Sequence, residues 1–274
     1  MTSRSDRLTR RNLLRAAAAA TATGALPFNA ASARPDKSAD LETELERQGV
    51  VGAFAHLDVT ADRLTMAHAA RAGERLIPAS TFKIANSLIA IETGVVADER
   101  HVFRWDGQPR SFKAWEQDMT LRQAIPASNV PVFQEIARRV GLNQYREWLD
   151  KLEYGNGLVG DAVETFWLDG PLKISAVEQT SFLAALALGQ LPISKRAQDL
   201  VKDMLRVETR TGRTLYAKSG WCFSTKPQIG WWVGWVEAPD RVDTFALNMD
   251  MASAEDAPRR ITAAKSMLAA LNVY

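Results

Sequence analysis

The alternation of hydrophobic and polar residues divides the chain into stretches that predict strands and stretches that predict helices. Two apolar runs joined by a turn at residues 60–62 predict consecutive strands over residues 50–59 and 63–70. Farther along, hydrophobic residues recur every three or four positions, which is typical of amphipathic helices. These predicted helices cover residues 130–141, 142–152, 175–189 and 195–205.

The pattern changes again toward the C-terminus. Three apolar stretches predict buried strands over residues 214–223, 229–237 and 243–251, and residues 259–271 predict a closing helix. Strands on both sides of a helical region favour an antiparallel sheet with helices segregated around it. The sequence therefore predicts an α/β chain of the α+β type, in which an antiparallel sheet is flanked by helices and joined to a helical subdomain.

One further predicted helix is hydrophobic nearly all round. In the stretch "PASTFKIANSLIAI", from Pro78 to Ile91, Lys83 is the only charged residue, so the helix is expected to be buried. Lys83 follows Ser80 by three residues, which places the amine and the hydroxyl on one helix face. Burial disfavours the ammonium and lowers the lysine pKa, so the amine, or a group built from it, can accept the serine proton. A lysine whose stem packs while its amine reaches water is the purely structural alternative.

Composition narrows the function classes. The chain has 274 residues, 46% hydrophobic and 24% charged, which is an ordinary globular balance. The net charge is +2 and no stripe of basic and aromatic residues is present, so nucleic acid is excluded as a partner. Cys222 is the single cysteine, so no internal disulfide can form, and a packed, inert thiol is expected. The three histidines show no metal-ligand spacing, so no metal is expected.

The first 33 residues have the pattern of an export signal. A basic segment with the pair Arg10-Arg11 precedes a mild apolar run and the small residues "ASA" at 31–33. The arginine pair resembles the twin-arginine type of signal, which directs export of folded proteins. The apolar run is too short for a stable membrane anchor. We therefore expect a signal peptide at 1–33, a catalytic domain at 34–274 and a periplasmic location.

Further motifs accompany the Ser80–Lys83 pair. Ser128-Asn129-Val130 enters a predicted helix, and Lys218-Ser219-Gly220 lies on a predicted strand. A set of S-x-x-K, S-D-N and K-T-G motifs marks serine enzymes that recognise penicillin; here the second motif ends in Val130 instead of Asn, and Ser219 stands in place of Thr. Two other stretches stand out, "YGN" at 154–156 and "FWLDGPLKISAVEQ" at 166–179.

Together with "KSGW" and "GWWVGWVE", these motifs closely resemble those of class D (oxacillinase-type) serine β-lactamases. The resemblance runs from about Val50 to the final helix. It implies the fold shared by serine β-lactamases and penicillin-binding-protein transpeptidases. It also implies that Ser80 is the nucleophile and that Lys83, carboxylated by CO2, is the general base. No other cofactor is implied.

The resemblance assigns roles to further residues. Trp167 would donate its indole N–H to the carbamate on Lys83, and Val130 and Leu168 would keep the pocket apolar. Plain core packing is the alternative for these three residues and is compatible with the role, whereas for Trp115 core packing explains the residue equally well. Ser128 would relay a proton to the departing ring nitrogen and Lys218 would supply positive charge. The backbone amides of Ser80 and Trp221 would form the oxyanion hole. Substrate binding would involve Ser219, Gly220 and Trp115. One arginine at the start of the last helix would bind the substrate carboxylate, and Arg260 is preferred to Arg259.

The implied activity is hydrolysis of the β-lactam amide bond of penicillin-type antibiotics through an acyl-enzyme on Ser80, which confers resistance. Three alternatives stay open: a β-lactam sensor domain that remains acylated, a cell-wall transpeptidase or carboxypeptidase, and an exported binding protein with a relic site. Sensors are tethered behind membrane helices, which the chain lacks, and transpeptidases usually have Asn where Val130 stands. The expected partner is a β-lactam small molecule, and the motifs carry no prediction of oligomeric state.

Overall fold

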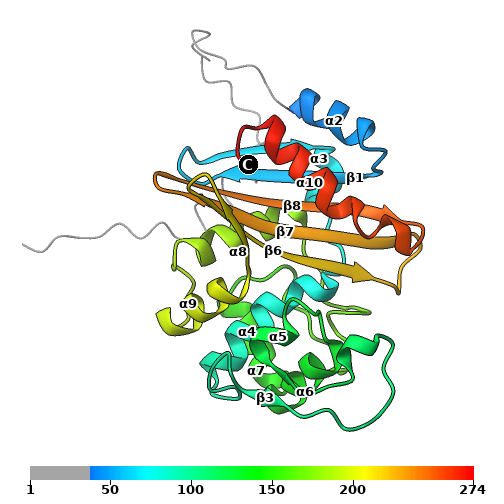
Figure 1. Cartoon of the computed structure of the whole chain (residues 1–274), viewed down its shortest axis with the longest axis vertical. Coiled ribbons are helices and arrows are strands. Elements are labelled where there is room, and N and C mark those ends of the chain that lie inside the picture. The colour runs from blue at the N-terminus through cyan, green and yellow to red at the C-terminus, as the bar shows by residue number, and fades with distance from the viewer. Residues whose placement is uncertain (1–37) are drawn as a thin grey trace, which may run out of the picture. The chain divides into compact units, whose positions relative to one another are not determined.

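An antiparallel sheet of six strands runs through residues 38–274, the part of the chain that the computed structural model describes (Figure 1). The predicted export signal at 1–33 lies outside the described residues. The strand order is β2-β1-β8-β7-β6-β5. The strands are β1 (Gly52–Asp58), β2 (Arg63–Ala67), β5 (Arg206–Arg210), β6 (Arg213–Cys222), β7 (Gln228–Ala238) and β8 (Arg241–Met251).

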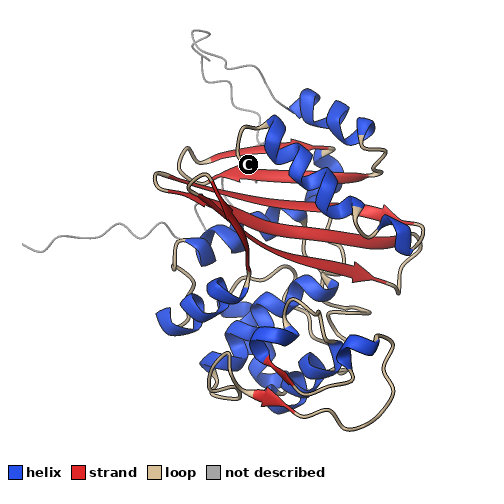
Figure 2. Ribbon diagram, in the orientation of Figure 1, coloured by secondary structure: helices blue, strands red, loops and turns tan. Residues whose placement is uncertain are grey.

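Helices cover both faces of this sheet, as Figure 2 shows. On one face, α2 (Ser38–Arg47) and α10 (Arg259–Ala270) pack over a core of large apolar side chains. On the other face lies α8 (Ala176–Ala187), whose first turn is closed by a capping box of Ser175 and Glu178. Because both faces are covered, the central strands β7 and β8 are buried along most of their length, and their sequences are nearly continuous apolar runs.

Most of the remaining helices gather beside α8 at one side of the sheet (Figure 1), whereas the short helix α3 (Ala69–Gly73) packs against β1 and α8. The core of this helical region is continuous with the core under α8. It includes α4 (Lys83–Glu92), which carries Lys83 in its first turn, and α6 (Val130–Val140), whose N-cap residue is Asn129. The other elements of this region and its connections are α5 (Leu121–Ala124), α7 (Leu142–Lys151), α9 (Lys195–Met204), and the short pair β3 (Val102–Phe103) and β4 (Met119–Thr120).

The predicted fold class is confirmed, since the sheet is antiparallel and its helices are segregated around it. Each predicted strand and helix is present with ends that differ by a few residues. Six helices and strands were not predicted: α2, the short helices α3 and α5, the short strands β3 and β4, and β5. The sequence of β5, "RVETR", is mostly exposed at the sheet edge, so it lacks the apolar run that marks the other strands.

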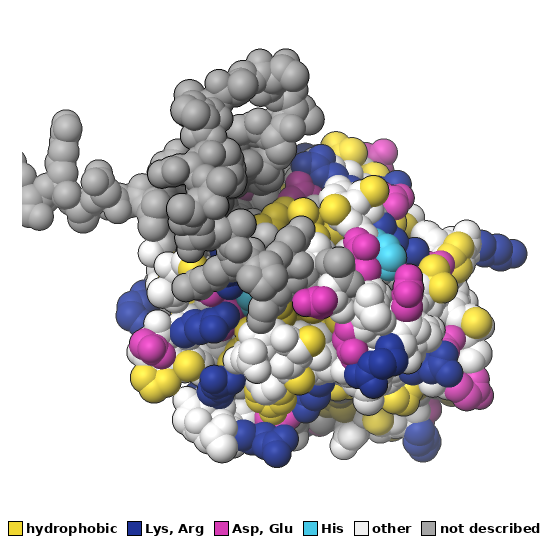
Figure 3. Space-filling model, turned by 90° about the horizontal axis from the view of Figure 1, so that it is seen from above, with side chains coloured by type: hydrophobic (Ala, Val, Ile, Leu, Met, Phe, Trp, Pro, Cys, Tyr) yellow, Lys and Arg dark blue, Asp and Glu magenta, His cyan; other side chains and the backbone are white. Residues whose placement is uncertain are grey.

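The surface of the described residues carries both signs of charge. On the face seen in Figure 3, basic and acidic side chains are interspersed. No helix among residues 38–274 combines the length and the hydropathy that a membrane crossing requires.

Candidate active site

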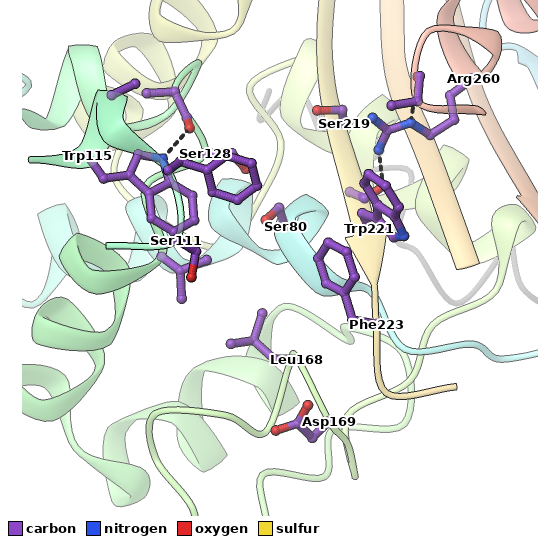
Figure 4. Close-up of a pocket in the computed structure, with 16 residues that line it drawn as sticks. Ser80, Ser111, Trp115, Ser128, Leu168, Asp169, Ser219, Trp221, Phe223 and Arg260 are labelled. Atoms are coloured by element: carbon purple, nitrogen blue, oxygen red, sulfur yellow. Dashed lines mark hydrogen bonds between the residues drawn. The ribbon is translucent and has the colours of Figure 1, made fainter. Parts of the chain in front are cut away.

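A cavity of about 790 Å³ opens between the helical region and the second half of β6, beyond the residues of β6 that pair with β5. In Figure 4, Ser80 lies at its centre, with Ser219 and Trp221 on one side and Trp115 and Ser128 on the other. Most of the lining is apolar. The predicted site residues that line the cavity are Ser80, Trp115, Ser128, Val130, Leu168, Ser219, Gly220, Trp221 and Arg260.

Ser80 sits on a 3₁₀ turn, η2 (Ala79–Phe82), that leads directly into α4. The preceding residue, Ala79, has a φ of 48°, in the left-handed region that residues with a Cβ rarely adopt. Only 9% of Ser80 is exposed. The turn therefore holds the serine hydroxyl at the floor of the cavity, next to the start of a helix.

Lys83 is the first residue of α4 and is fully buried. Its Nζ donates a hydrogen bond to Ser80 Oγ at 2.7 Å and lies 5.2 Å from the ring centre of Phe133. Burial, and secondly the positive charge of Lys218, hold the pKa of Lys83 well below its ordinary value. No carboxylate among residues 38–274 forms an ion pair with it. The arrangement favours a neutral amine that can accept the serine proton.

Trp167 is also fully buried, but it lies behind the cavity lining. Its ring packs against Phe166 at 4.9 Å and against Phe82, the neighbour of Lys83, at 5.6 Å between ring centres. The indole Nε1 has no hydrogen-bond acceptor among the described residues. A buried donor without a partner is rare and calls for an explanation.

Ser128 and Lys218 come from different elements and are hydrogen-bonded to each other; Ser128 lines the cavity, whereas Lys218 is buried behind the lining. Ser128, with a φ of 53°, ends the loop before α6, and Lys218 lies on β6. Lys218 Nζ donates to Ser128 Oγ at 3.1 Å and to the Ser219 carbonyl at 2.9 Å. Burial, and secondly the charge of Arg260, lower the Lys218 pKa to about 7. This lysine can therefore give or take a proton near neutral pH.

The two candidate arginines point in different directions. Arg260, in the first turn of α10, lines the cavity, and its guanidinium donates to the Gly220 carbonyl at 2.5 Å and to the Ala257 carbonyl at 2.9 Å. No carboxylate within residues 38–274 forms an ion pair with it. Arg259 is more than half exposed and pairs with Asp256 at 3.4 Å. Arg260 is therefore the cation that remains available to an anion in the cavity.

Two phenylalanines at the cavity, Phe112 and Phe223, were not predicted as site residues, although their aromatic partners Trp115 and Trp221 were. Phe112 packs on Trp115 with ring centres 4.7 Å apart, and Phe223 stacks on Trp221 at 4.6 Å. Both phenylalanines are more than half exposed. The one sequence signal was the position of Phe223, two residues after the K-S-G-W motif; only the fold brings Phe112 to the same cavity. Within residues 38–274, no group of three or more His, Cys, Asp or Glu side chains could hold a metal ion.

Comparisons with known proteins agree on one family. Residues 37–269 match the penicillin binding protein transpeptidase domain. Beta-lactamase OXA-5 of Pseudomonas aeruginosa is 42% identical over 229 residues, which cover 82% of this chain and 86% of that protein. Beta-lactamase OXA-48 of Klebsiella pneumoniae is 45% identical over 198 residues, covering 72% of this chain and 75% of that protein. The crystal structure of the class D β-lactamase YbXI from Nostoc superposes with a TM-score of 0.83 at 37% identity, covering 85% of this chain and 99% of that one. The resemblance found in the motifs therefore holds over the whole domain, and the chain belongs to the class D family of serine β-lactamases.

Proposed function

We propose that this chain hydrolyses the β-lactam amide bond of penicillin-type antibiotics through an acyl-enzyme on Ser80, and so confers resistance. The proposal is carried by one observation: a fully buried lysine amine with a lowered pKa lies 2.7 Å from the hydroxyl oxygen of Ser80, at the floor of an apolar cavity. A serine needs such an adjacent base to act as a nucleophile.

In the acylation step, Ser80 Oγ forms a bond to the lactam carbonyl carbon while its proton passes to the base at Lys83. The bond from that carbon to the ring nitrogen then breaks. The nitrogen needs a proton as it departs, and the hydroxyl of Ser128 can supply one. Lys218, bonded to Ser128 at 3.1 Å and with a pKa of about 7, can replace that proton.

The negative charge that develops on the carbonyl oxygen requires donors. The backbone N–H groups of Ser80, on its turn, and of Trp221, on β6, are the proposed oxyanion hole. The substrate carboxylate would lie near Arg260, whose guanidinium has no acidic partner in the described residues, with Ser219 and Gly220 in the same cavity lining. Lys218, behind the lining, is close enough to Arg260 for the two charges to interact.

Carboxylation of Lys83 by CO2 fits the residues around it. Carboxylation requires a neutral amine, and burial favours that form. The indole N–H of Trp167, buried and without an acceptor, is a donor that a carbamate would satisfy. When bound, the CO2 group supplies a carboxylate that can serve as general base. Val130 and Leu168, both at the cavity lining, keep its surroundings apolar.

The same proposal includes export. Residues 1–33 would be a twin-arginine-type signal that is removed after Ala33, leaving the catalytic domain 34–274 in the periplasm. N-terminal sequencing of the periplasmic protein tests this directly. Replacement of Arg10 and Arg11 by lysine should leave the chain unprocessed in the cytoplasm, and processing that continues in that variant would contradict the proposal.

The decisive experiment follows benzylpenicillin hydrolysis by the purified chain with and without added bicarbonate, beside the Ser80→Ala variant. We expect turnover that rises with bicarbonate and is absent from Ser80→Ala. Stoichiometric acylation of Ser80 without turnover would instead identify a sensor or a transpeptidase. No acylation at all would overturn the proposal.

A further inference from the structure

The backbone turn that carries Ser80 is held in an unfavourable conformation. Ala79, immediately before the serine, has a φ of 48° although it is not a glycine. A residue with a Cβ pays a conformational cost in this region, and such a conformation persists only when its surroundings hold it. Contacts from neighbouring side chains therefore have to hold this turn.

Thr81, the residue after the nucleophile, supplies some of these contacts. Its hydroxyl donates to the Pro78 carbonyl at 2.8 Å, which closes the turn on itself. The same hydroxyl accepts a hydrogen bond from Gln179 Nε2, on α8, at 2.9 Å. Both side chains are almost completely buried, at 1% and 0% exposed. A chain of two hydrogen bonds therefore links α8 to the start of the turn.

The direction of these two hydrogen bonds is fixed by the chemistry of the threonine hydroxyl. A threonine hydroxyl has one hydrogen, and here that hydrogen goes to Pro78, so Gln179 has to be the donor. The other amide atom of the glutamine, Oε1, has no partner among the described residues. Gln179 thus makes its one side-chain hydrogen bond to the turn that carries the nucleophile.

The methyl group of Thr81 faces the strand that supplies the second oxyanion donor. A Cβ added at Gly220 would lie 3.0 Å from Thr81 Cγ2 and 3.0 Å from the Pro78 carbonyl oxygen, so β6 rests directly on this turn. Opposite Gly220 on β7, Trp231 donates its indole N–H to the Ile77 carbonyl at 2.9 Å. The Thr81 methyl group, together with the backbone of Pro78 and Thr81, therefore forms the surface of the turn against which β6 packs.

We propose that Gln179 is a positioning residue for the oxyanion hole, acting through the hydroxyl of Thr81. By locking that side chain, Gln179 fixes the Ser80 turn against β6, and with it the spacing between the N–H groups of Ser80 and Trp221. This inference rests on the proposed function and deepens it, because it names what aims the two donors.

The test uses two nearly isosteric variants, Gln179→Met and Thr81→Val, and their combination. Full loss of one oxyanion-hole donor costs about 100- to 1,000-fold in rate, so misaligned donors are expected to cost about tenfold. Acylation and deacylation both pass through an oxyanion, so both rate constants should fall by a similar factor. The double variant should be no slower than Thr81→Val, because the glutamine acts through that hydroxyl.

A matched control separates positioning from general stability. Thr244 is fully buried on β8, and its hydroxyl donates to the Thr180 carbonyl on the same helix, α8, at 3.0 Å. Thr244→Val therefore removes a comparable buried hydrogen bond from α8 without touching the Ser80 turn. It should lose similar thermal stability and keep the parent rates. Should Gln179→Met not fold, Thr81→Val, which keeps the shape of the side chain, carries the test.

Two readouts distinguish the mechanism. Affinity for a boronic acid, which forms a tetrahedral adduct on Ser80, should fall in proportion to kcat/KM in Gln179→Met and Thr81→Val, while the bicarbonate response and the pH profile stay those of the parent. Variants with parent rates, or with losses matched by Thr244→Val, would overturn the inference. A changed bicarbonate response would also overturn it, because the effect would then run through Lys83. If the parent chain itself fails to hydrolyse benzylpenicillin, the proposed function falls and this inference with it; an active parent with unaffected variants removes the inference alone.

Discussion

Replacing Lys218 with methionine should make the protein more stable while making the proposed enzyme much less active. Lys218 is 4% exposed, and its pKa falls from 10.5 to about 7, first because of burial and secondly because Arg260 is nearby. The folded protein therefore binds a proton at this amine far more weakly than the unfolded chain does. That difference is a free-energy cost of folding.

The size of the cost follows from the pKa difference. A drop from 10.5 to about 7 corresponds to about 5 kcal/mol at about 1.4 kcal/mol per pKa unit. Methionine removes this cost but also removes the hydrogen bonds to Ser128 and to the Ser219 carbonyl, about 1 kcal/mol each. The net expectation is a gain of about 2 to 3 kcal/mol near pH 7, or about 5 to 10 °C in Tm for a domain of this size.

The lowered pKa of Lys218 also determines how the stability difference between Lys218→Met and the parent changes with pH. Between about pH 7 and pH 10.5 the unfolded chain holds the proton and the folded chain does not, so the stability of the parent rises with pH across this window. Below about pH 7 the cost is present in full. The advantage of Lys218→Met over the parent should therefore be largest at pH 6 to 7 and should shrink toward pH 10.

Urea unfolding at pH 6, 7, 8.5 and 10 measures this difference directly. Lys195→Met is the control, since Lys195 is an exposed lysine paired with Asp199 at 2.5 Å, and its replacement should change stability by less than about 1 kcal/mol at every pH. The reasoning is refuted if Lys218→Met is less stable than the parent at pH 7, or if its advantage does not change with pH.

Three further changes test other parts of the site and fold. Trp167→Phe removes the buried indole N–H that has no acceptor in the described residues, and the bicarbonate concentration for half-maximal turnover should rise about tenfold in an activity titration. Arg260→Ala should lower kcat/KM for benzylpenicillin about 100-fold whereas Arg259→Ala, an exposed residue, should stay within about twofold; equal losses would contradict the assignment of the carboxylate site. Gly155→Ala places a Cβ 2.1 Å from a backbone oxygen at a φ of +58°, and should lower the free energy of unfolding in urea by about 3 kcal/mol or more. Gly157→Ala, at a φ of +67° with open space around it, should lower that free energy by only about 1 kcal/mol.

The sequence was informative wherever a local physical rule decides the structure. The apolar runs of β7 and β8 predict buried strands because both faces of these strands must be covered. The Ser175–Glu178 capping box marks the start of α8 because it satisfies helix amides within one turn. Where such rules were weak, prediction failed: β5 has no apolar run, since it lies at the exposed sheet edge.

The site residues also fall into those that a local sequence rule predicts and those that only the fold brings together. The pairing of Ser80 and Lys83 follows from their spacing alone, since residues three apart near a helix start share a face. That Lys83 is fully buried was predictable from the apolar helix around it. Motif order was enough to indicate the family, and the comparisons confirm it over most of the chain.

Contacts between distant segments depended on the fold. Lys218 meets Ser128 although 90 residues separate them, and Gln179 meets Thr81 across 98. Neither contact can be predicted from the neighbouring sequence, because both depend on how β6 and α8 pack against the helical region. Whether Arg259 or Arg260 faces the cavity is likewise a matter of how α10 is rotated against the sheet. The sequence alone thus determined the elements and the chemical groups, through rules that act over one turn or one strand, whereas tertiary packing decided which of those groups share a cavity and how closely they approach.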